Sequence, residues 1–355
     1  MNSFNSSQRF RIGLRSALAQ AAACICAFLL IHSADTATAK RPKPKVQIKF
    51  ATLAPEGSTW MKTMRSLDDE LREKTKNRLG FKFYTGGVQG DEKDVLRKMR
   101  NGQLHAGGFT GFGLGAIVPG VRVLELPFLF EAQDEVEFVR SRMDSLFNSL
   151  FEEKGFLFLG WADVGFIYMF SNSPVQSPED LKRAKMWIWS GDPLAELFFK
   201  AFQISPIPLS APDVLTSLQT GIVNAVYSSP LACVALQWFT RVKFMSDVPI
   251  THALGAVLVT KQALKKVSDE DIQVLREIFG RYLHSLNEKT RVQNDEAVES
   301  MKKEGIEIVA VEEQARRSFF STGKGAWDDG VGKLYSQELL DQVTEIVRHY
   351  RNTSK

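Results

Sequence analysis

The chain has 355 residues, of which 44% are hydrophobic and 24% charged. This is an ordinary composition for a soluble globular protein, and it argues against wholesale disorder and against a polytopic membrane protein. Lys and Arg number 45 against 41 Asp and Glu, so the net charge is only +4 and nothing in the charge balance calls for a nucleic-acid partner. The length is sufficient for two domains with separate cores.

The first 39 residues have the pattern of a secretory signal peptide. A basic start precedes an apolar run over residues 16–31, and Ala37-Thr38-Ala39 forms a small-x-small cleavage signal. The run is short for a membrane-spanning helix, so an uncleaved anchor is the weaker alternative. We therefore predict cleavage after Ala39 and export of a chain that does not itself span a membrane.

Cysteine usage fits an exported protein that needs no disulfide. Cleavage after Ala39 would remove Cys24 and Cys26 and leave Cys233 alone. Lipid attachment at either of the first two is disfavoured, because both lie inside the apolar run with no Leu three residues before them. The neighbours of Cys233 are apolar and offer no adjacent base, so we predict a buried side chain and not a nucleophile.

In chain order, the first part of the mature chain alternates between strand and helix patterns. The predicted elements are a strand at 46–51, a helix from 58 to about 75, a strand at 81–84, a helix at 91–99 and a strand at 105–110. Ser58 is placed to cap the first helix. Such alternation is typical of a parallel sheet covered by helices.

The remaining chain continues this pattern and adds one long helix. The predicted elements are a helix at 131–154, strands at 156–161 and 165–170, a short helix from 177, a strand at 185–189, helices at 193–202 and 211–220, strands at 224–227 and 254–260, and a helix at 268–303. Ser268 can cap the last helix, with acids in its first turn. Its length suits a brace between two lobes.

Signatures of catalysis and of metal binding are missing. The sequence contains no G-x-S-x-G, H-E-x-x-H, C-x-x-C or Walker A pattern, and its five histidines are scattered without ligand spacing. The glycine-rich segment 107–115 departs from G-x-G-x-x-G. We therefore expect a tight turn that lets the backbone approach a ligand or a neighbour, with a nucleotide site as the weaker alternative.

Six segments, taken in order, resemble the solute-binding subunit of TRAP transporters (tripartite ATP-independent periplasmic), the DctP-type family. They are ATLAPEGSTW at 51–60, GGVQGDE at 86–92, LPFLF at 126–130, GFLFLGW at 155–161, SPEDLK at 177–182 and LQTGIVN at 218–224. No single segment is decisive, but their order, their spacing and the signal peptide agree. The resemblance covers residues 46 to about 314.

The resemblance implies an α/β fold of the two-lobed periplasmic binding protein class, with mixed sheets covered by helices, a ligand cleft between the lobes and a long bracing helix. The expected division is 40–164 plus 252–290 for lobe I, 165–251 plus 291–335 for lobe II, and a C-terminal helix at 336–355. The implied role is capture of a small organic solute in the periplasm and its delivery to TRAP-type membrane subunits driven by an ion gradient. No enzyme activity and no cofactor are implied.

Three ligand positions of the family are changed in this sequence. The Arg that pairs with a substrate carboxylate aligns with Trp187, a second Arg with Ile167, and an Asn with Ser229. Because a buried carboxylate needs a cation or dense hydrogen bonding, we predict an apolar or amphipathic ligand. The predicted ligand-binding residues are Glu56, Trp60, Phe109, Phe128, Ile167, Trp187, Tyr227 and Ser229, with no catalytic or metal-ligating residue.

Two alternatives stay open at this point. Trp187 could fill the cleft or the core, with Lys185 or Arg122 taking a carboxylate. The same fold could also serve a transport system other than TRAP, as a carrier of a hydrophobic ligand such as a lipid or a sterol.

Overall fold

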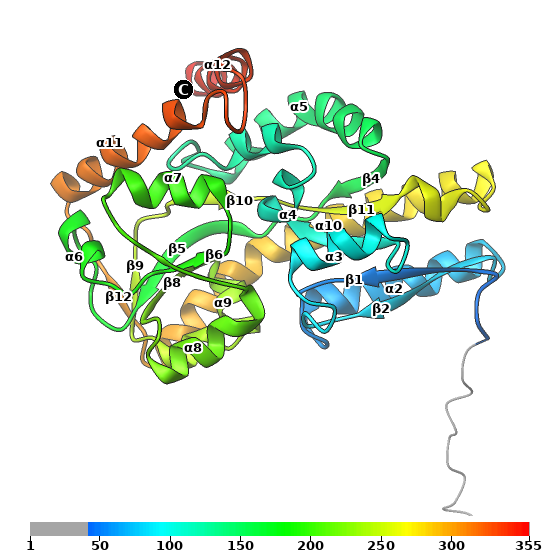
Figure 1. Ribbon diagram of the computed structural model, residues 1–355, viewed down its shortest axis with the longest axis horizontal. Helices are drawn as coiled ribbons and strands as arrows, with labels where there is room; N and C mark the ends of the chain where they lie inside the picture. Colours follow the sequence, from blue (N-terminus) through cyan, green and yellow to red (C-terminus); the bar gives the residue numbers. More distant parts are fainter. Residues whose placement is uncertain (1–41, 355) are drawn as a thin grey trace, which may run out of the picture. The chain divides into compact units, whose positions relative to one another are not determined.

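The computed structural model describes residues 42–354, so the predicted signal peptide, its cleavage site, Cys24 and Cys26 lie outside the described residues. The residues from Pro44 onward form one compact unit built on two sheets (Figure 1). Across residues 42–354, none of the helices has the length and apolarity needed to cross a membrane.

The first sheet has five strands in the order β2-β1-β3-β11-β4. Their bounds are β1 Val46–Ala51, β2 Leu79–Tyr84, β3 Ala106–Thr110, β4 Phe156–Trp161 and β11 Gly255–Thr260. β1 is parallel to both of its neighbours, whereas β11 runs antiparallel between β3 and β4. A purely parallel sheet, as the alternation predicted, is therefore wrong. β11 follows strands of the second sheet in the chain, and it runs opposite to β3 and β4.

The first sheet is covered by helices whose apolar faces the sequence pattern predicted. Ser58 caps α2, its Oγ accepting from the Met61 amide at 3.2 Å. Met61 and Met64 of α2 pack in one buried cluster with Ile48 and Phe50 of β1. The other helical segments in this part are α3 Glu92–Arg100, α4 Gly111–Gly115, η1 Pro119–Glu125 and α5 Gln133–Glu153, after α2 Thr59–Lys74.

The second sheet is shorter-stranded and has the order β10-β5-β9-β12, with β8 also paired to β5. The bounds are β5 Gly165–Ser171, β8 Ala225–Ser228, β9 Phe244–Ser246, β10 Thr251–Ala253 and β12 Glu307–Val309. A two-stranded parallel sheet, β6 Trp187–Trp189 with β7 Ile207–Leu209, is linked to it through the bridge between Met186 and Ala225. We call the part around the first sheet lobe I and the part around the second lobe II.

Lobe II holds two apolar clusters under its helices. Cys233 is fully buried in one of them beside Trp187 and Trp238, and burial raises the pKa of its thiol, as expected for a structural cysteine. The helical segments of this lobe are α6 Pro178–Lys182, α7 Pro193–Ala201, η2 Ala211–Asp213, α8 Val214–Thr220, α9 Pro230–Ala235, η3 Trp238–Arg241 and α11 Glu313–Gly330.

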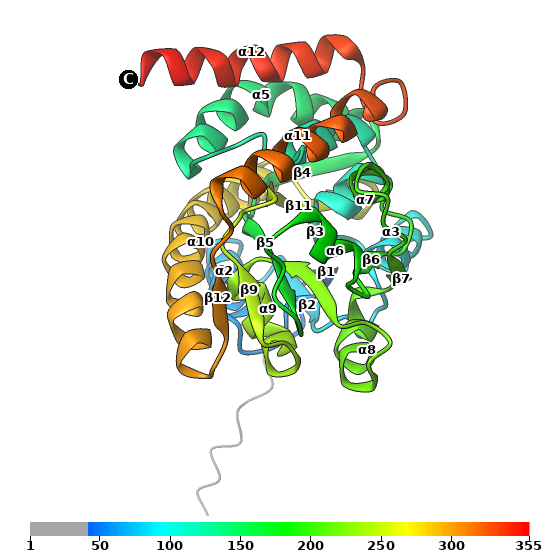
Figure 2. The same ribbon diagram turned by 90° about the vertical axis from the view of Figure 1, so that its left-hand side faces the viewer.

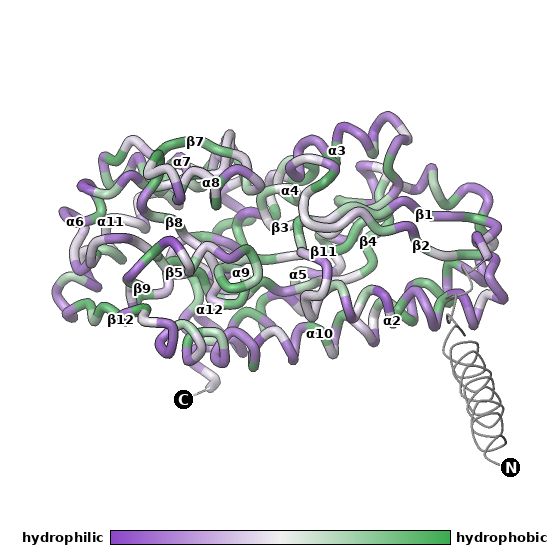
Figure 3. The backbone as a smooth tube through the Cα atoms, turned by 90° about the horizontal axis from the view of Figure 1, so that it is seen from below, coloured by the Kyte–Doolittle hydropathy of each residue, from purple (hydrophilic) through white to green (hydrophobic). Residues whose placement is uncertain are grey.

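The long helix α10, Asp269–Lys303, runs past both sheets (Figures 1 and 3). The Ser268 Oγ caps it, accepting from the Asp271 amide at 3.2 Å, and Asp271 is held in turn by Arg78 at 2.7 Å. α10 contacts α2 and β4 in lobe I, then α9 and β5 in lobe II. It therefore has the position of the brace that the sequence predicted.

The C-terminal helix α12, Gln337–Thr353, packs on α5 and η1 (Figure 2). A short segment, η4 Lys261–Leu264, follows β11 and leads into α10. The residue borders predicted for the two lobes remain a prediction.

Candidate functional site

A cavity of about 640 Å³ is lined by residues of both lobes. Lobe I contributes the loop after β1, the end of β3 and η1, and lobe II contributes β5, β6, β8 and α7. Much of the wall is apolar. α9 and the residue that follows it contribute Leu231, Val234, Ala235 and Leu236 to this wall. α10 contributes Thr290, Gln293, Glu296, Ala297 and Ser300. The volume falls within the usual range for small-molecule sites.

On the lobe I side, the backbone of the glycine-rich segment 107–115 lies close against neighbouring side chains. It runs as β3 and continues directly as α4, so it is a strand-to-helix junction. A Cβ on Gly108 would lie 2.7 Å from the Trp60 ring, and one on Gly111 would lie 1.8 Å from Glu125 Oε2. The expected close approach of backbone to its neighbours is therefore present, and it brings Trp60 and Glu125 against the cavity wall.

On the lobe II side, aromatic rings stack behind the wall. Trp187 stacks on Tyr227 with ring centroids 4.9 Å apart and meets Trp238 edge-on at 5.2 Å. Its Nε1 donates to the Leu209 carbonyl at 3.1 Å. Both residues line the cavity, and because Trp187 is only 1% exposed while Tyr227 is partly exposed, Tyr227 leaves more aromatic surface open.

A second tryptophan joins the two lobes near the cavity. Trp189 stacks on Phe112 of α4 with centroids 4.9 Å apart, and its Nε1 donates to Asp91 Oδ2 at 2.7 Å. Lys93 lies over the Phe112 ring, with its Nζ 5.0 Å from the ring centroid, and the Nζ donates to the Gly191 carbonyl at 2.9 Å. We call Asp91, Lys93, Phe112 and Trp189 the rim clasp.

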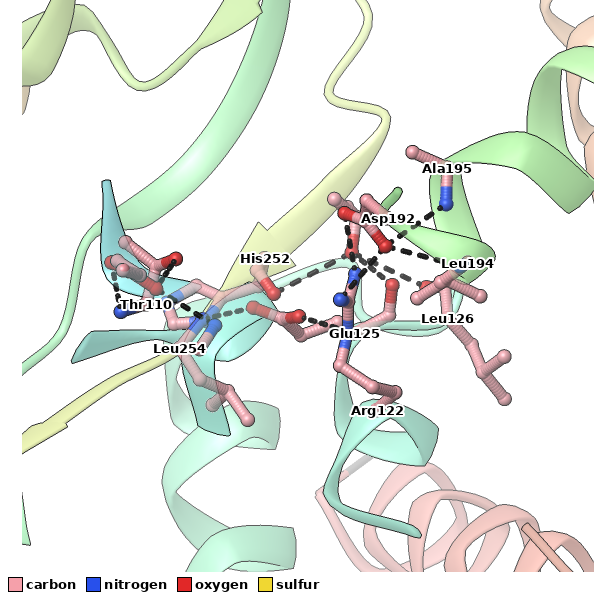
Figure 4. Close-up of polar contacts among 12 residues, drawn as sticks. Thr110, Arg122, Glu125, Leu126, Asp192, Leu194, Ala195, His252 and Leu254 are labelled. Carbon is pink, nitrogen blue, oxygen red and sulfur yellow. Dashed lines mark hydrogen bonds and ion pairs between the residues drawn. The ribbon is translucent and has the colours of Figure 1, made fainter. Parts of the chain in front are cut away.

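A buried ion cluster also joins the lobes (Figure 4). Arg122 of η1 binds Asp192 with both terminal nitrogens, at 2.9 and 3.1 Å, and its Nε lies 2.8 Å from Glu125 Oε2. The other Glu125 oxygen accepts from the Leu254 amide at 2.7 Å, and Asp192 Oδ1 also caps α7 by accepting from the Leu194 amide. The three charged side chains are 5–7% exposed. We call Arg122, Glu125 and Asp192 the buried ion cluster.

Burial and charge act against each other in this cluster. Burial by itself would lower the pKa of Arg122, but Asp192 and Glu125 raise it above its usual value, so the guanidinium keeps its proton. Burial raises the pKa of Glu125, and Arg122 opposes this shift. Burial also raises the pKa of the nearby Tyr227, which therefore remains a neutral phenol.

Glu92 is a separate buried acid in the lining. It accepts from the Thr110 amide at 2.8 Å and from the Gly113 amide at 2.7 Å, and it lies 3.1 Å from Thr110 Oγ1. Burial raises the pKa of Glu92 from 4.5 to about 8, so the carboxyl is protonated at neutral pH. Through these contacts Glu92 fixes the start of α4, the helix that carries Phe112 of the rim clasp.

The charges of the lining are unbalanced toward acids. Among the lining residues that the structure describes, Arg122 is the only Lys, Arg or His. Asp163 is neutralised from outside the lining by Arg140, and Glu296 is exposed. Lys185, the other cation considered from the sequence, is exposed and donates to the Gly221 carbonyl at 3.2 Å. No unpaired cation of the described chain therefore faces the cavity.

Six of the eight predicted ligand-binding residues line the cavity: Trp60, Phe109, Ile167, Trp187, Tyr227 and Ser229. Glu56 and Phe128 do not. Glu56 is half exposed and pairs with Arg65 at 2.7 Å. Phe128 has a positive φ of 58°, and its ring packs on Phe198 and Phe320 in lobe II. Ser229 is committed to capping α9, with its Oγ accepting from the Ala232 amide.

Two sets of residues near the site were not predicted from the sequence: the partners of Arg122 and the rim clasp. Asp192 lies 70 positions after Arg122, and Trp189 lies 98 positions after Asp91. Such contacts form only when the two lobes meet. The sequence does carry one signal: Trp187 and Trp189 are two residues apart in a strand and so share one of its faces, and their ring centroids lie 5.7 Å apart.

The sequence model of the DctP family, described as bacterial extracellular solute-binding protein, family 7, matches residues 50–333. This match spans most of the chain. The chain belongs to the DctP family. The resemblance predicted from the sequence motifs is thus confirmed.

Solved structures of TRAP periplasmic solute-binding proteins share the fold of this DctP chain. One from Fusobacterium nucleatum with bound sn-glycerol-3-phosphate has a TM-score of 0.80 at 21% identity, covering 87% of this chain and 99% of its own. One from Xanthobacter autotrophicus with bound β-D-galacturonate has a TM-score of 0.79 at 20% identity, covering 85% and 99%. The predicted two-lobed α/β fold is confirmed.

Curated relatives of the DctP chain are also solute-binding proteins. A solute-binding protein of Chromohalobacter salexigens is 25% identical, and the match covers 61% of this chain and 65% of the relative. The 2,3-diketo-L-gulonate-binding periplasmic protein YiaO of Escherichia coli is 25% identical over 69% and 75%. The ectoine-binding periplasmic protein TeaA of Halomonas elongata is 25% identical over 77% and 82%.

Proposed function

We propose that this DctP chain is exported to the periplasm, captures a small organic solute in the cavity between its lobes and passes it unchanged to TRAP-type membrane subunits. The observation that carries the proposal is the cavity of about 640 Å³ that both lobes line in a chain of this family. The described lining residues include no nucleophile paired with a general base, which supports binding of the solute without conversion.

The ligand that fits this cavity is apolar or amphipathic. Several relatives and similar structures carry acids in their names, such as 2,3-diketo-L-gulonate and β-D-galacturonate. The sequence motifs predict that Trp187 stands at the position of the family's carboxylate-binding Arg. The one guanidinium in the described lining lies between two acidic side chains. An incoming carboxylate would therefore be buried without a free cation, which is unfavourable.

The experiment is a thermal-shift titration of the exported chain after unfolding and refolding to remove carried solute. The panel contains mono- and dicarboxylates, fatty acids, sterols and aromatic amphiphiles. We expect stabilisation by apolar or amphipathic compounds, and a ligand at a hundred times its Kd adds about 2.7 kcal/mol. A shift with small carboxylates alone would contradict the apolar ligand, and a lipid or sterol as the sole ligand would favour the carrier function outside TRAP transport.

Trp187→Arg is the variant that tests the changed family position. The new guanidinium would stand beside Tyr227 and restore a cation to the aromatic wall. We expect weaker binding of the apolar ligand and a gain in carboxylate binding, measured by calorimetry. An affinity for the apolar ligand equal to that of the parent chain would remove Trp187 from the specificity of the site.

A further inference from the structure

We infer that the solute captured in this cavity carries a positively charged group, an organic ammonium or guanidinium, which binds beside the buried ion cluster. This inference rests on the proposed function, and it adds the charge of the ligand to the apolar body proposed above.

The buried ion cluster holds one more acid than base. Both Asp192 oxygens accept from Arg122, one Glu125 oxygen accepts from the Leu254 amide, and the other lies 2.8 Å from Arg122 Nε. Three of these four oxygens accept hydrogen bonds, and the fourth, Glu125 Oε2, lies at ion-pair distance from Arg122 Nε, so the geometry is that of two carboxylates around one guanidinium. Two carboxylates against one guanidinium leave one negative charge in a region that is 5–7% exposed.

Nothing else in the described lining offsets that charge. The Asp163 carboxylate is neutralised by Arg140, Glu92 is a protonated acid at neutral pH, and Glu296 adds a further acid at the exposed end. Uncompensated buried charge is unfavourable, so a ligand cation would stabilise the closed cavity and a ligand anion would be repelled.

The surroundings of the cluster suit an organic cation. The Tyr227 hydroxyl accepts from the Trp189 amide at 3.3 Å, and the phenol interacts electrostatically with Asp192, Arg122 and Glu125. Tyr227 lines the cavity, so its aromatic side chain lies beside the surplus negative charge. Organic cations bind over aromatic faces, especially where water is excluded.

An unsatisfied acceptor in the lining points the same way. The Gln293 Oε1 is buried and has no hydrogen-bond partner within residues 42–354. Gln293 lies on α10 and lines the same cavity. An N–H group of the ligand would satisfy this oxygen, because buried acceptors without partners are unfavourable.

The test compares probes that share a body and differ in head group. One series is phenethylammonium, phenethyl alcohol and phenylacetate, and the other is octylammonium, octanol and octanoate. Affinities are measured by calorimetry on the refolded exported chain at two salt concentrations. We expect the ammonium member of a series to bind at least about tenfold more tightly than the carboxylate, or about 1.4 kcal/mol. Equal or tighter binding of the carboxylate, or failure of both ammonium probes to bind, overturns the inference.

Two variants assign the preference to the buried ion cluster. Glu125→Gln removes the surplus charge and should reduce the ammonium-to-carboxylate preference to about threefold or less. Asp192→Asn, which keeps an acceptor for the α7 cap, serves if the first variant does not fold. Glu179→Gln, an exposed acid of α6 outside the lining, is the matched control and should leave the preference unchanged. A preference that survives both cluster variants overturns the assignment.

The failure of this inference can be told apart from the failure of the proposed function. Mass spectrometry of solute released by denaturing the periplasmic protein gives the charge of what it carried. A solute with a carboxylate and no cationic group would overturn the inference and leave solute capture standing. No carried solute together with no probe binding would contradict both.

Discussion

The buried ion cluster and the rim clasp both join lobe I to lobe II, but they do so with different chemistry. The cluster is almost closed to solvent and consists of one basic and two acidic side chains. The clasp is partly exposed and combines ring stacking between Phe112 and Trp189 with a hydrogen bond to Asp91. The charged side chains of the buried ion cluster are desolvated and depend on one another. The contacts of the rim clasp are individually weaker and more independent.

The two sets of contacts therefore divide the roles of selectivity and closure between them. The cluster brings a net charge to the ligand, so changes there alter which solute is accepted. The rim clasp has one acid and one base, so it brings no net charge to the cavity. Changes there therefore alter how firmly the two lobes are held together.

Arg122→Met is expected to have the largest effect. It leaves Glu125 and Asp192 buried without their cation, and removing one partner of a buried pair typically costs about 3–5 kcal/mol. The free energy of unfolding from urea titration measures the loss. Arg65→Met, which breaks the exposed pair with Glu56, is the control and should cost at most about 1 kcal/mol. Equal losses in the two variants would show that the cluster is no stronger than a surface pair.

The cluster also shows what sequence reasoning could and could not reach. Local signals predicted well what depends on neighbouring residues: the Ser58 and Ser268 caps, the long α10 and the strands β1 and β5. The strands β7, β9, β10 and β12 were missed, and each has three residues, too few to show a clear alternating pattern.

For the site, the family motifs led to six residues that line the cavity, but not to the orientation of their side chains. Trp187 was placed at the changed Arg position, yet whether it faces the cavity depends on Tyr227, forty residues later in the chain. Phe128 has a positive φ and packs on Phe198 and Phe320 instead of lining the cavity, and no sequence signal marks this. Arg122 was named as a candidate cation, but its two acidic partners become apparent only in the fold.

Asp91→Ser tests the clasp. Serine keeps an N-cap for α3 but is too short to reach Trp189 Nε1 and the Ala211 amide, which both donate to Asp91 Oδ2. Leaving these donors without a partner is expected to cost about 1–3 kcal/mol in unfolding free energy. Tryptophan fluorescence should change with it. Asp94→Ala, on the same helix and partly exposed, is the control, and a loss as large in that variant would assign the effect to the cap of α3.

The buried acid behind the clasp predicts a pH dependence. With the pKa of Glu92 at about 8 in the folded chain and 4.5 otherwise, the folded state holds a proton that the unfolded state has lost. Stability from this group is therefore full below about pH 4.5 and is lost as the pH rises toward 8, at up to about 1.4 kcal/mol per pH unit. Urea titrations across this range measure the slope.

Glu92→Gln should remove that slope, because an amide does not titrate. The variant will be less stable at low pH, since a single amide oxygen cannot accept from both the Thr110 and the Gly113 amides. The same slope in the variant and in the parent chain would show that another group is responsible for the pH dependence.

Lys93→Met is expected to have the smallest effect and gives the sharpest contrast with the buried ion cluster. It removes a cation 5.0 Å from the Phe112 ring and a bond to the Gly191 carbonyl, both at the exposed edge of the clasp. Contacts of this kind contribute about 0.5–1 kcal/mol, and their screening makes them weaker at high salt. Because Lys93 does not line the cavity, the preference among charged probes should not change. A change in that preference would mean that charge outside the cavity also sets selectivity, and the division of roles between the cluster and the clasp would then fail.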